Sequence, residues 1–363
     1  MVSQAQQEQI YYPKTYRIAA PSLAILPDAR GAGLGNIGVA TSADAAAVYH
    51  NLSKTVFSPN TWSASANYTP WMSQLVNDMG VAYLGGYYKW GSNRFTHAVG
   101  ASFRYFSIGK VSAFPGEGKA PIEIYPNEWA LDAGYAIKLL PQLGAGLTLR
   151  YAHINMNYSG VENNATASAF MADLSLTYRK ILPFKGKDIV LQAGLAIKNI
   201  GNKVSFDNGK TYSFLPASFN IGVGAQYAIT DQWDIQLSTE VNKLMAPTLP
   251  PQNLKAYQSE LNRYYQMSAI GGVFASWNDS ANGFQEELQE LSPAIGAEIT
   301  YDKMLTGRLG WRYNNPAINP GSGFYSGLGL TFNQWQLDLS YYISSNAYDA
   351  LDKTFRISAA IQF

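Results

Sequence analysis

The chain contains no cysteine and few charged residues. Without cysteine, disulfide frameworks, thiolate metal sites and cysteine nucleophiles are excluded. Only 14% of the 363 residues are charged, against about a quarter in an ordinary soluble domain. The 26 basic and 25 acidic residues leave a formal net charge of +1. This balance argues against a nucleic-acid partner, because phosphate binding needs a basic face.

Long apolar runs are also missing, whereas aromatic residues are abundant. No run approaches the roughly 18 apolar residues of a membrane-spanning helix, and the mean hydropathy is −0.13. The chain has 25 Tyr, 16 Phe and 8 Trp, which together make 13% of it. This composition is typical of an outer-membrane β-barrel and a poor fit to a cytosolic enzyme. We therefore expect an all-β protein that crosses the membrane with strands.

From residue 61 onward the sequence alternates with a period of two. In 62–69 one face carries Trp, Ala, Ala and Tyr and the other Ser, Ser, Asn and Thr, and 335–343 repeats the pattern. Such alternation predicts strands. We predict a 14-stranded antiparallel transmembrane barrel with strands at about 60–69, 79–90, 94–107, 127–138, 142–155, 167–180, 187–199, 216–228, 232–246, 292–301, 304–314, 322–332, 335–345 and 354–363.

The predicted connections alternate between tight turns and long loops. Tight turns at 91–93, 139–141, 230–231, 302–303 and 333–334 stand between longer links, and the link 181–186 falls on the short side. Outer-membrane barrels have short periplasmic turns and long external loops. The sequence therefore predicts an N-terminal segment, 1–58, in the lumen or at the periplasmic face, and a barrel, 59–363, whose long external loops are 70–78, 108–126, 156–166, 200–215 and 247–291.

Aromatic residues mark one end of the predicted strands. With rising and descending strands assigned, seven rings are expected at the periplasmic interface, where amphipathic rings are favoured. They are Trp62, Trp90, Phe95, Trp233, Tyr301, Trp335 and Phe363. The alternating last strand with a terminal Phe resembles the C-terminal signature of bacterial outer-membrane proteins.

The segment before the barrel does not alternate and is rich in glycine. Residues 33–38, Gly-Leu-Gly-Asn-Ile-Gly, match a GxGxxG search. A dinucleotide site is rejected, because no strand precedes the glycines and no βαβ unit surrounds them. We expect instead a turn-rich segment packed near the barrel.

Several stretches of the chain resemble one known family. They are 27–35 (PDARGAGLG), 38–45 (GVATSADA), 50–54 (HNLSK), 68–78 (YTPWMSQLVND), 199–201, 214–216 and 240–244. They resemble the PorV (LptO) family of the type IX secretion system of Bacteroidetes, part of the wider FadL-like barrels with fourteen strands and a lumen-associated N-terminal segment. Leu52 departs from the family, which usually has Pro after the Asn.

The resemblance implies a role in protein secretion at the outer membrane. Members of the family are thought to bind the C-terminal signal domain of secreted proteins. They accompany the giant translocon barrel (SprA, or Sov) and then the attachment complex with PorU, PorQ and PorZ. The resemblance thus implies a cargo shuttle with loops on the cell surface, without a cofactor or an enzymatic activity.

Two loops carry apolar residues that suit partner contact. Loop 70–78 contains Trp71, Met72, Leu75 and Val76, and an apolar loop needs a covering partner unless it folds into the lumen or the headgroup zone. Loop 247–291 contains Leu249, Leu254, Tyr257 and Leu261, partly at helical spacing, although packing on the barrel rim is the alternative. The acidic stretch 285–291 is expected to be a solvated helical turn.

Two other functions fit less well. A FadL-type channel for hydrophobic small molecules needs an apolar tunnel, but the predicted inward face is polar and its charges suggest cross-lumen pairs. The inward residues are Ser63, Ser65, Asn67, Arg104, Asp132, Arg150, Asp173, Arg179, Gln192, Gln226, Gln236, Glu240 and Asp338. An outer-membrane hydrolase is disfavoured, because no GxSxG elbow is present and the three histidines, His50, His97 and His153, are predicted to lie apart. No cluster of His, Asp and Glu has the spacing of metal ligands. The residues of 278–283 are typical of a turn, which is a better interpretation than a calcium-binding loop.

Overall fold

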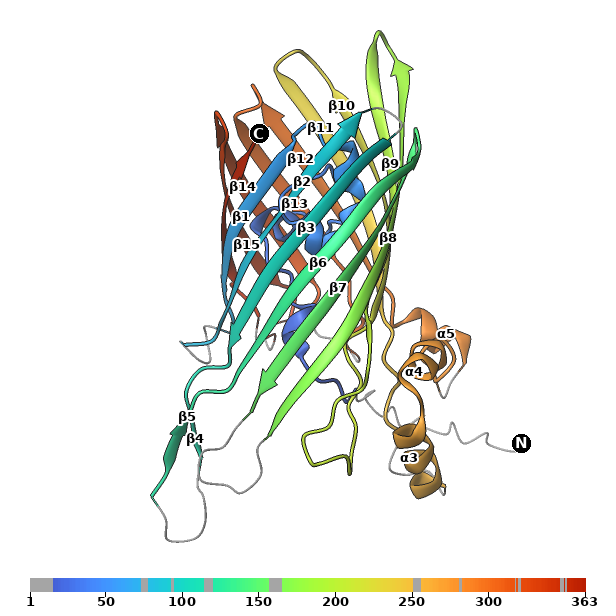
Figure 1. The fold of residues 1–363 in the computed structure, drawn as a ribbon. Helices are drawn as coiled ribbons and strands as arrows, with labels where there is room; N and C mark the ends of the chain where they lie inside the picture. Colours follow the sequence, from blue (N-terminus) through green and yellow to red (C-terminus); the bar gives the residue numbers. More distant parts are fainter. Residues whose placement is uncertain are drawn as a thin grey trace, which may run out of the picture.

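The computed structural model confirms the predicted barrel. It describes residues 16–72, 78–92, 95–113, 120–156, 165–250, 256–280, 283–316, 318, 321–346, 349 and 351–363. Fourteen antiparallel strands close into one barrel (Figure 1). They are β1 (Trp62–Pro70), β2 (Gly80–Ser92), β3 (Phe95–Ser107), β6 (Asn127–Leu140), β7 (Leu143–Asn155), β8 (Thr166–Phe184), β9 (Lys187–Gly201), β10 (Ser218–Ala228), β11 (Trp233–Leu244), β12 (Ser292–Tyr301), β13 (Leu305–Arg312), β14 (Gly323–Phe332), β15 (Trp335–Ser344) and β16 (Phe355–Gln362).

The barrel closes where its first and last strands pair. β1 and β16 run antiparallel, with a register from Ser63 opposite Gln362 to Tyr68 opposite Ile357. Sequential neighbours pair around the rest of the wall. Closure removes the free edges that an open sheet would expose, so every strand has a partner on both sides.

The pleat separates an inner polar face from an outer apolar face, as the alternation predicts. Along β3, Ser102 and Arg104 are buried toward the lumen, whereas Phe95, Val99 and Phe103 are exposed on the outer wall. Among the described residues, no helix is long and apolar enough to cross a membrane.

The two rims of the barrel differ in their connections. At one end, here the short-turn rim, strands are joined by hairpins such as Lys185–Gly186 and Asp302–Lys303, whose positive φ angles suit tight turns. The link expected at 181–186 is mostly strand, because β8 continues to Phe184. The β8–β9 hairpin therefore extends beyond the neighbouring hairpins of this rim (Figure 1).

The opposite end, here the long-loop rim, carries the remaining elements. A small hairpin, β4 (Val111–Ala113) with β5 (Ile122–Ile124), extends from β3 and β6. Three helices follow β11: α3 (Tyr257–Gln266), α4 (Ala269–Ala275) and α5 (Phe284–Leu288). Figure 1 shows them beside the ends of β9 and β11, outside the circle of strands.

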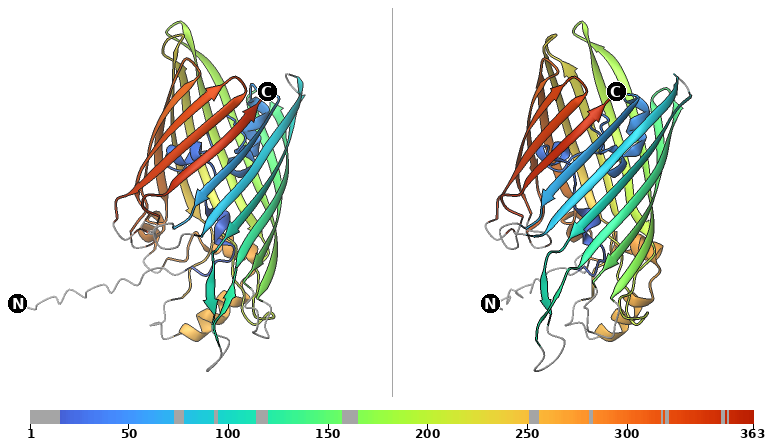
Figure 2. Two further views of the ribbon diagram at one scale, coloured as in Figure 1. Left: turned by 90° about the vertical axis from the view of Figure 1, so that its left-hand side faces the viewer. Right: turned by 60° about the vertical axis from the view of Figure 1, so that its left-hand side comes forward.

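Residues 16–58 occupy the lumen from rim to rim (Figure 2). Tyr16 bridges to Thr248 and Ile18 to Phe214 at the long-loop rim. The chain then forms η1 (Pro21–Ala24), α1 (Ala29–Gly33), α2 (Ala47–His50) and η2 (Leu52–Phe57) inside the barrel. It leaves at the short-turn rim, where the Lys89 side chain donates to the Ser58 carbonyl. We call residues 16–58 the plug.

Candidate functional site

The glycines of the plug allow its backbone to lie against the barrel wall. A Cβ on Gly38 would stand 2.0 Å from Nδ1 of His50, and one on Gly33 would stand 3.1 Å from the backbone of Gly327 in β14. The backbone N–H groups of Gly38 and Val39 both donate to Glu240 of β11, each at 2.8 Å. The GxGxxG match is therefore a packing motif that holds a wall carboxylate.

A buried acid–histidine pair begins the plug's polar core. Asp28 caps α1 by accepting the Gly31 N–H at 2.7 Å, and its other oxygen lies 2.6 Å from Nε2 of His50. Both side chains are only 5% exposed. Burial alone would raise the pKa of the Asp28 carboxyl, but the charge and hydrogen bond of His50 and the Gly31 N–H outweigh it and lower that pKa below its usual range.

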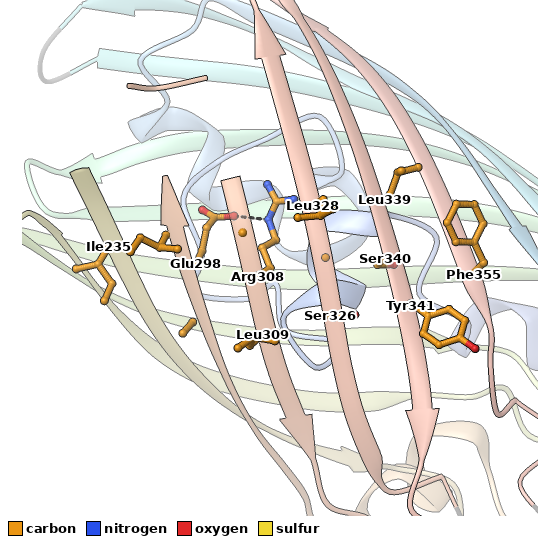
Figure 3. A pocket seen from close by; sticks show the side chains of 14 residues that line it. Ile235, Glu298, Arg308, Leu309, Ser326, Leu328, Leu339, Ser340, Tyr341 and Phe355 are labelled. Carbon is orange, nitrogen blue, oxygen red and sulfur yellow. Dashed lines mark hydrogen bonds and ion pairs between the residues drawn. The ribbon is translucent and has the colours of Figure 1, made fainter. Parts of the chain in front are cut away.

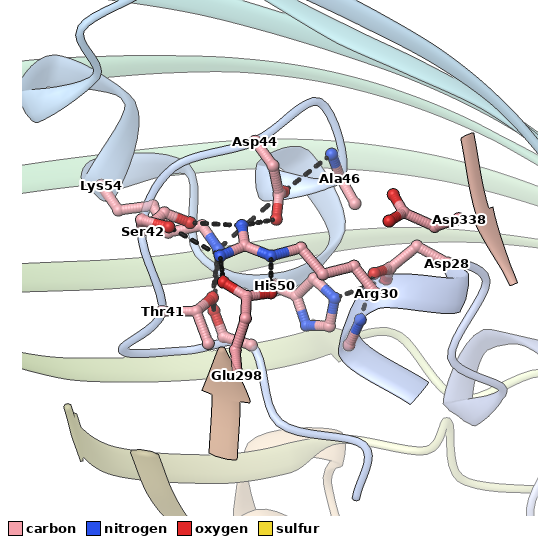
Figure 4. A network of polar contacts seen from close by, with 12 residues as sticks. Asp28, Arg30, Thr41, Ser42, Asp44, Ala46, His50, Lys54, Glu298 and Asp338 are labelled. Carbon is pink, nitrogen blue, oxygen red and sulfur yellow. Dashed lines mark hydrogen bonds and ion pairs between the residues drawn. The ribbon is translucent and has the colours of Figure 1, made fainter. Parts of the chain in front are cut away.

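Arg30 joins the plug to the wall (Figure 4). Its guanidinium makes a two-point contact with Glu298 of β12, at 3.0 Å to each oxygen. It also donates to the Asp44 carboxylate at 2.8 Å and to the Ser42 hydroxyl at 2.7 Å. A two-point guanidinium–carboxylate contact fixes orientation as well as charge, so the plug is held in one position at this level.

The same carboxylate continues the network around the wall. Arg308 of β13 donates to Glu298 at 2.6 Å and to Asp338 of β15 at 2.7 Å. Lys54 of η2 is fully buried close by, where its ammonium donates to the Gly38 carbonyl at 2.9 Å and to Thr41 at 3.1 Å. Burial lowers the pKa of the Lys54 ammonium. Plug and wall therefore share one charge network.

A second network lies on the opposite wall, as the polar inward register predicts. Arg150 of β7 contacts Asp132 of β6 at 2.7 Å and Asp173 of β8 at 3.0 Å. Asp173 also accepts the backbone N–H of Asn199 at 2.6 Å. Arginines and carboxylates therefore meet on the inward face, where a buried charge needs a partner, but these pairs join neighbouring strands and do not cross the lumen as expected.

The lumen does not present an apolar passage among the described residues. A cavity of about 690 Å³ at the short-turn side is lined mainly by polar groups, including Arg30, Lys54, Arg179, Gln192 and Gln226. A second cavity of about 640 Å³ is apolar but opens on the outer wall, between residues such as Leu309, Leu328 and Phe355 (Figure 3). Because it opens outward, this cavity is not a passage through the barrel.

The long-loop rim is tied together by the start of the plug. Arg17 donates to the Tyr265 hydroxyl at 2.8 Å and to Thr211 at 2.8 Å. Tyr264 of α3 packs with Phe214 and Ala246, and Leu249 packs against this cluster. One short segment thereby fixes the loop after β9 and the loop after β11.

The residues singled out in the loops lie in different surroundings. Trp71 is half-buried against Ile25, Val81 and Phe106, so it packs on the plug and the rim of its own barrel. Leu249, Tyr257 and Leu261 are half-buried on or near α3, as is Met72 in its own loop. Leu75, Val76 and Leu254 lie outside the described residues. The cluster around Phe214 brings Leu249 close to α3 but does not include Trp71.

The seven aromatic residues proposed as a girdle lie at or within two residues of the short-turn ends of their strands. Trp62, Phe95, Trp233 and Trp335 begin strands, whereas Tyr301 ends one. Trp90 lies near the end of β2, and Phe363 follows β16 and stacks on Trp62 with ring centroids 4.7 Å apart. His97 faces outward among them and contacts the Tyr135 hydroxyl at 2.6 Å.

The acidic stretch 285–291 is not solvated, contrary to our expectation. Glu286, Glu287 and Glu290 are each less than a tenth exposed. The Lys243 ammonium bridges Glu287 and Glu290, and Glu287 accepts the backbone N–H of Asp279 at 3.0 Å. Asp279, Glu287 and Glu290 lie within metal-ligand reach of one another, and the Lys243 ammonium stands between the two glutamates. Lys243 lies 44 positions before Glu287 and 47 before Glu290, so the sequence pattern did not indicate it as their partner.

Comparison with known proteins identifies the family. The family model "Type IX secretion system protein PorV" matches residues 4–252, which is more than half of the chain. The chain belongs to the PorV family. It is therefore a component of the type IX secretion system with a barrel of the outer-membrane kind. A comparison with curated proteins gives no match.

Several solved structures are similar to this chain. The TodX deltaS2S3 mutant monoaromatic hydrocarbon channel is 11% identical with a TM-score of 0.50, and the alignment covers 92% of this chain and 97% of that one. The Pseudomonas putida toluene transporter TodX is 10% identical with a TM-score of 0.49, and the alignment again covers 92% of this chain and 97% of that one. A Pseudomonas aeruginosa FadL homologue is 11% identical with a TM-score of 0.47, and the alignment covers 96% of this chain and 100% of that one. At such identity the likeness concerns the fold alone.

Proposed function

We propose that this barrel binds the C-terminal signal domain of secreted cargo at its long-loop rim. It then carries the cargo from the translocon to the attachment complex. The match to the PorV family over 4–252 is the observation that carries this proposal. In this proposal the long-loop rim faces the cell exterior and the short-turn rim faces the periplasm, as is usual for outer-membrane barrels.

The filled lumen supports a role at the rim rather than through the barrel. Arg30, Glu298 and Arg308 bind the plug to the wall on one side, and Arg150 with its two aspartates fills the other. A folded or extended cargo segment would have to break these buried pairs to pass. Partners therefore meet the loops. They are the SprA (Sov) translocon, PorU with the other attachment-complex proteins, and the cargo domain.

We place the cargo contact on the two apolar loops. Trp71, Met72, Leu75 and Val76 form the first part and Leu249, Leu254, Tyr257 and Leu261 the second. Trp71 is half-buried at the rim and Leu249 packs on the α3 cluster, so each loop is anchored to the barrel at one of these residues. A docking patch on a rigid base loses less entropy on binding.

Replacing Trp71, Met72 and Leu75 together by Ser tests this assignment. We expect cargo co-purification to fall while the barrel keeps its heat-modifiable migration in gels. Since Trp71 also packs against Ile25, loss of packing has to be separated from loss of contact. Ile108→Ser, which disturbs the same cluster from the other loop, is the matched control. Equal cargo recovery from the triple variant and the wild type would refute the site.

A channel for hydrophobic small molecules is the alternative. The fold is shared with hydrocarbon channels, but the cavity described inside this barrel is lined mainly by polar residues. Uptake of a labelled fatty acid by vesicles that contain the purified barrel would favour the channel. We expect uptake no faster than in vesicles without protein.

A further inference from the structure

Two residues on the outward register of β10 and β11 are covered by protein. Phe219 and Lys243 are direct cross-strand partners, and they share the register of Ile221, Val223 and Leu237, which are exposed on the outer wall. An ammonium in this register would face lipid, which is costly. Lys243 is nevertheless only 2% exposed, so another part of the chain covers the wall here.

The cover is the helical loop that contains α4 and α5. The Trp277 ring lies 5.5 Å from the Phe219 ring and 5.3 Å from the Lys243 ammonium. Glu287 and Glu290 neutralise the same ammonium. Two buried ion pairs and a ring contact thus hold the loop against the outside of the barrel, at the long-loop ends of β10 and β11.

The opposite surface of the two helices is apolar and uncovered. On α4, Ile270 and Phe274 follow each other at helical spacing and are 61% and 71% exposed. On α5, Phe284 is 75% and Leu288 49% exposed. α4 contains no charged residue, and the glutamates of α5 are buried on its other side. The exposed surface is therefore an apolar face without a charge of its own.

This face continues the lipid-facing wall. The helical loop contacts residues of the outward register, Phe219 and Lys243, and Figure 1 shows α4 and α5 at the long-loop end of the barrel, to one side of its axis. The other side of α4 packs closely on the protein, because a Cβ at Gly272 would stand 2.3 Å from the Phe214 ring. An amphipathic helix fixed at the height of the membrane boundary suits the interface between headgroups and acyl chains.

We propose that α4 and α5 lie in the headgroup layer on the long-loop side, with Ile270, Phe274, Phe284 and Leu288 inserted among the acyl chains. The occupant of the apolar face is the bilayer itself. The helical loop thus lies at the membrane surface beside the barrel, and Lys243 attaches it to the wall. The residues of this face differ from those of the proposed cargo contact, although both sets include residues of the loop after β11.

The absence of cysteine makes the proposal directly testable. Phe274→Cys and Phe284→Cys, each labelled with an environment-sensitive dye, would be studied in the full chain in vesicles of phosphatidylethanolamine and phosphatidylglycerol. Asn262→Cys on the exposed side of α3 is the aqueous control, and Leu309→Cys on the outer wall, 69% exposed in the structure, is the lipid control. Heat-modifiable migration selects the folded variants.

We expect the dyes at both phenylalanine positions to emit at shorter wavelength than the dye at position 262. Nitroxide-labelled lipids should quench them as they quench the dye at 309. Emission and quenching equal to the aqueous control would overturn the proposal. Shielding that appears only when cargo or translocon is added would also overturn it, because the face would then be a protein-docking surface. If one variant does not fold, Leu288→Cys takes its place.

Discussion

Replacing Arg30 by Met should loosen the plug, because this side chain provides the main charged contact between plug and wall on its side of the lumen. It contacts both oxygens of Glu298 and the Asp44 carboxylate. Removing one partner of a buried ion pair costs about 3 to 5 kcal/mol. The lower value applies here, since Glu298 keeps Arg308 as a partner.

A loss of about 3 kcal/mol corresponds to roughly a hundredfold larger population with the plug displaced. The assay is twofold: the urea midpoint of unfolding in vesicles, and the conductance of the barrel in a planar bilayer. We expect a lower midpoint and more frequent opening events.

Arg263→Met is the matched control for this experiment. Arg263 is an arginine on α3 whose side chain is 76% exposed and whose only described ion pair, with Glu260, spans 3.7 Å. Exposed pairs of this kind contribute little, so the control should behave as the wild type. If Arg30→Met and Arg263→Met give the same midpoint and the same conductance, the plug is not held by its buried charges.

Three further predictions concern a loop, the plug and the outer wall. Hydrogen bonds from Thr211 and Ser205 lower the pKa of Asp207 to about 2. The Asp207 carboxylate therefore stabilises its loop above the ordinary pKa of about 3.9, and this stabilisation is lost as the pH falls from there toward 2. Amide exchange at Thr211, corrected for the intrinsic rate, should accelerate in that range, and Asp207→Asn should abolish the pH dependence. Gly38→Ala puts a Cβ against the His50 ring and should cost about 1–3 kcal/mol; an unchanged urea midpoint would contradict the packing described. Leu309→Arg should cost about 2–4 kcal/mol in vesicles if it lies near the bilayer midplane, and a midpoint equal to that of the wild type would place this residue outside the lipid.

The strands could be predicted because a pleated wall between water and lipid leaves a period of two in the sequence. All fourteen predicted strands overlap observed ones, and the network of Arg150, Asp132 and Asp173 follows from their shared inward register. This pairing between neighbouring strands needed only the register and the rule that buried charges are paired.

The plug and the helical loop could not be predicted in the same way. Residues 16–58 have no periodicity, so nothing in the sequence indicates that Arg30 meets Glu298, 268 positions later. Lys243 lies on the outward register, where the alternation alone predicts lipid, and only the fold of the loop after β11 supplies its carboxylates. The expectation of a solvated acidic turn was wrong for the same reason.

The path of the plug has a consequence for what the barrel encloses. Its first described residues lie at the long-loop rim and its last at the short-turn rim, where β1 starts beside the end of β16. The plug runs directly into β1, and β1 closes the cylinder by pairing with β16. The wall therefore encloses part of its own chain, and this content of the lumen is covalently joined to the strand at the seam.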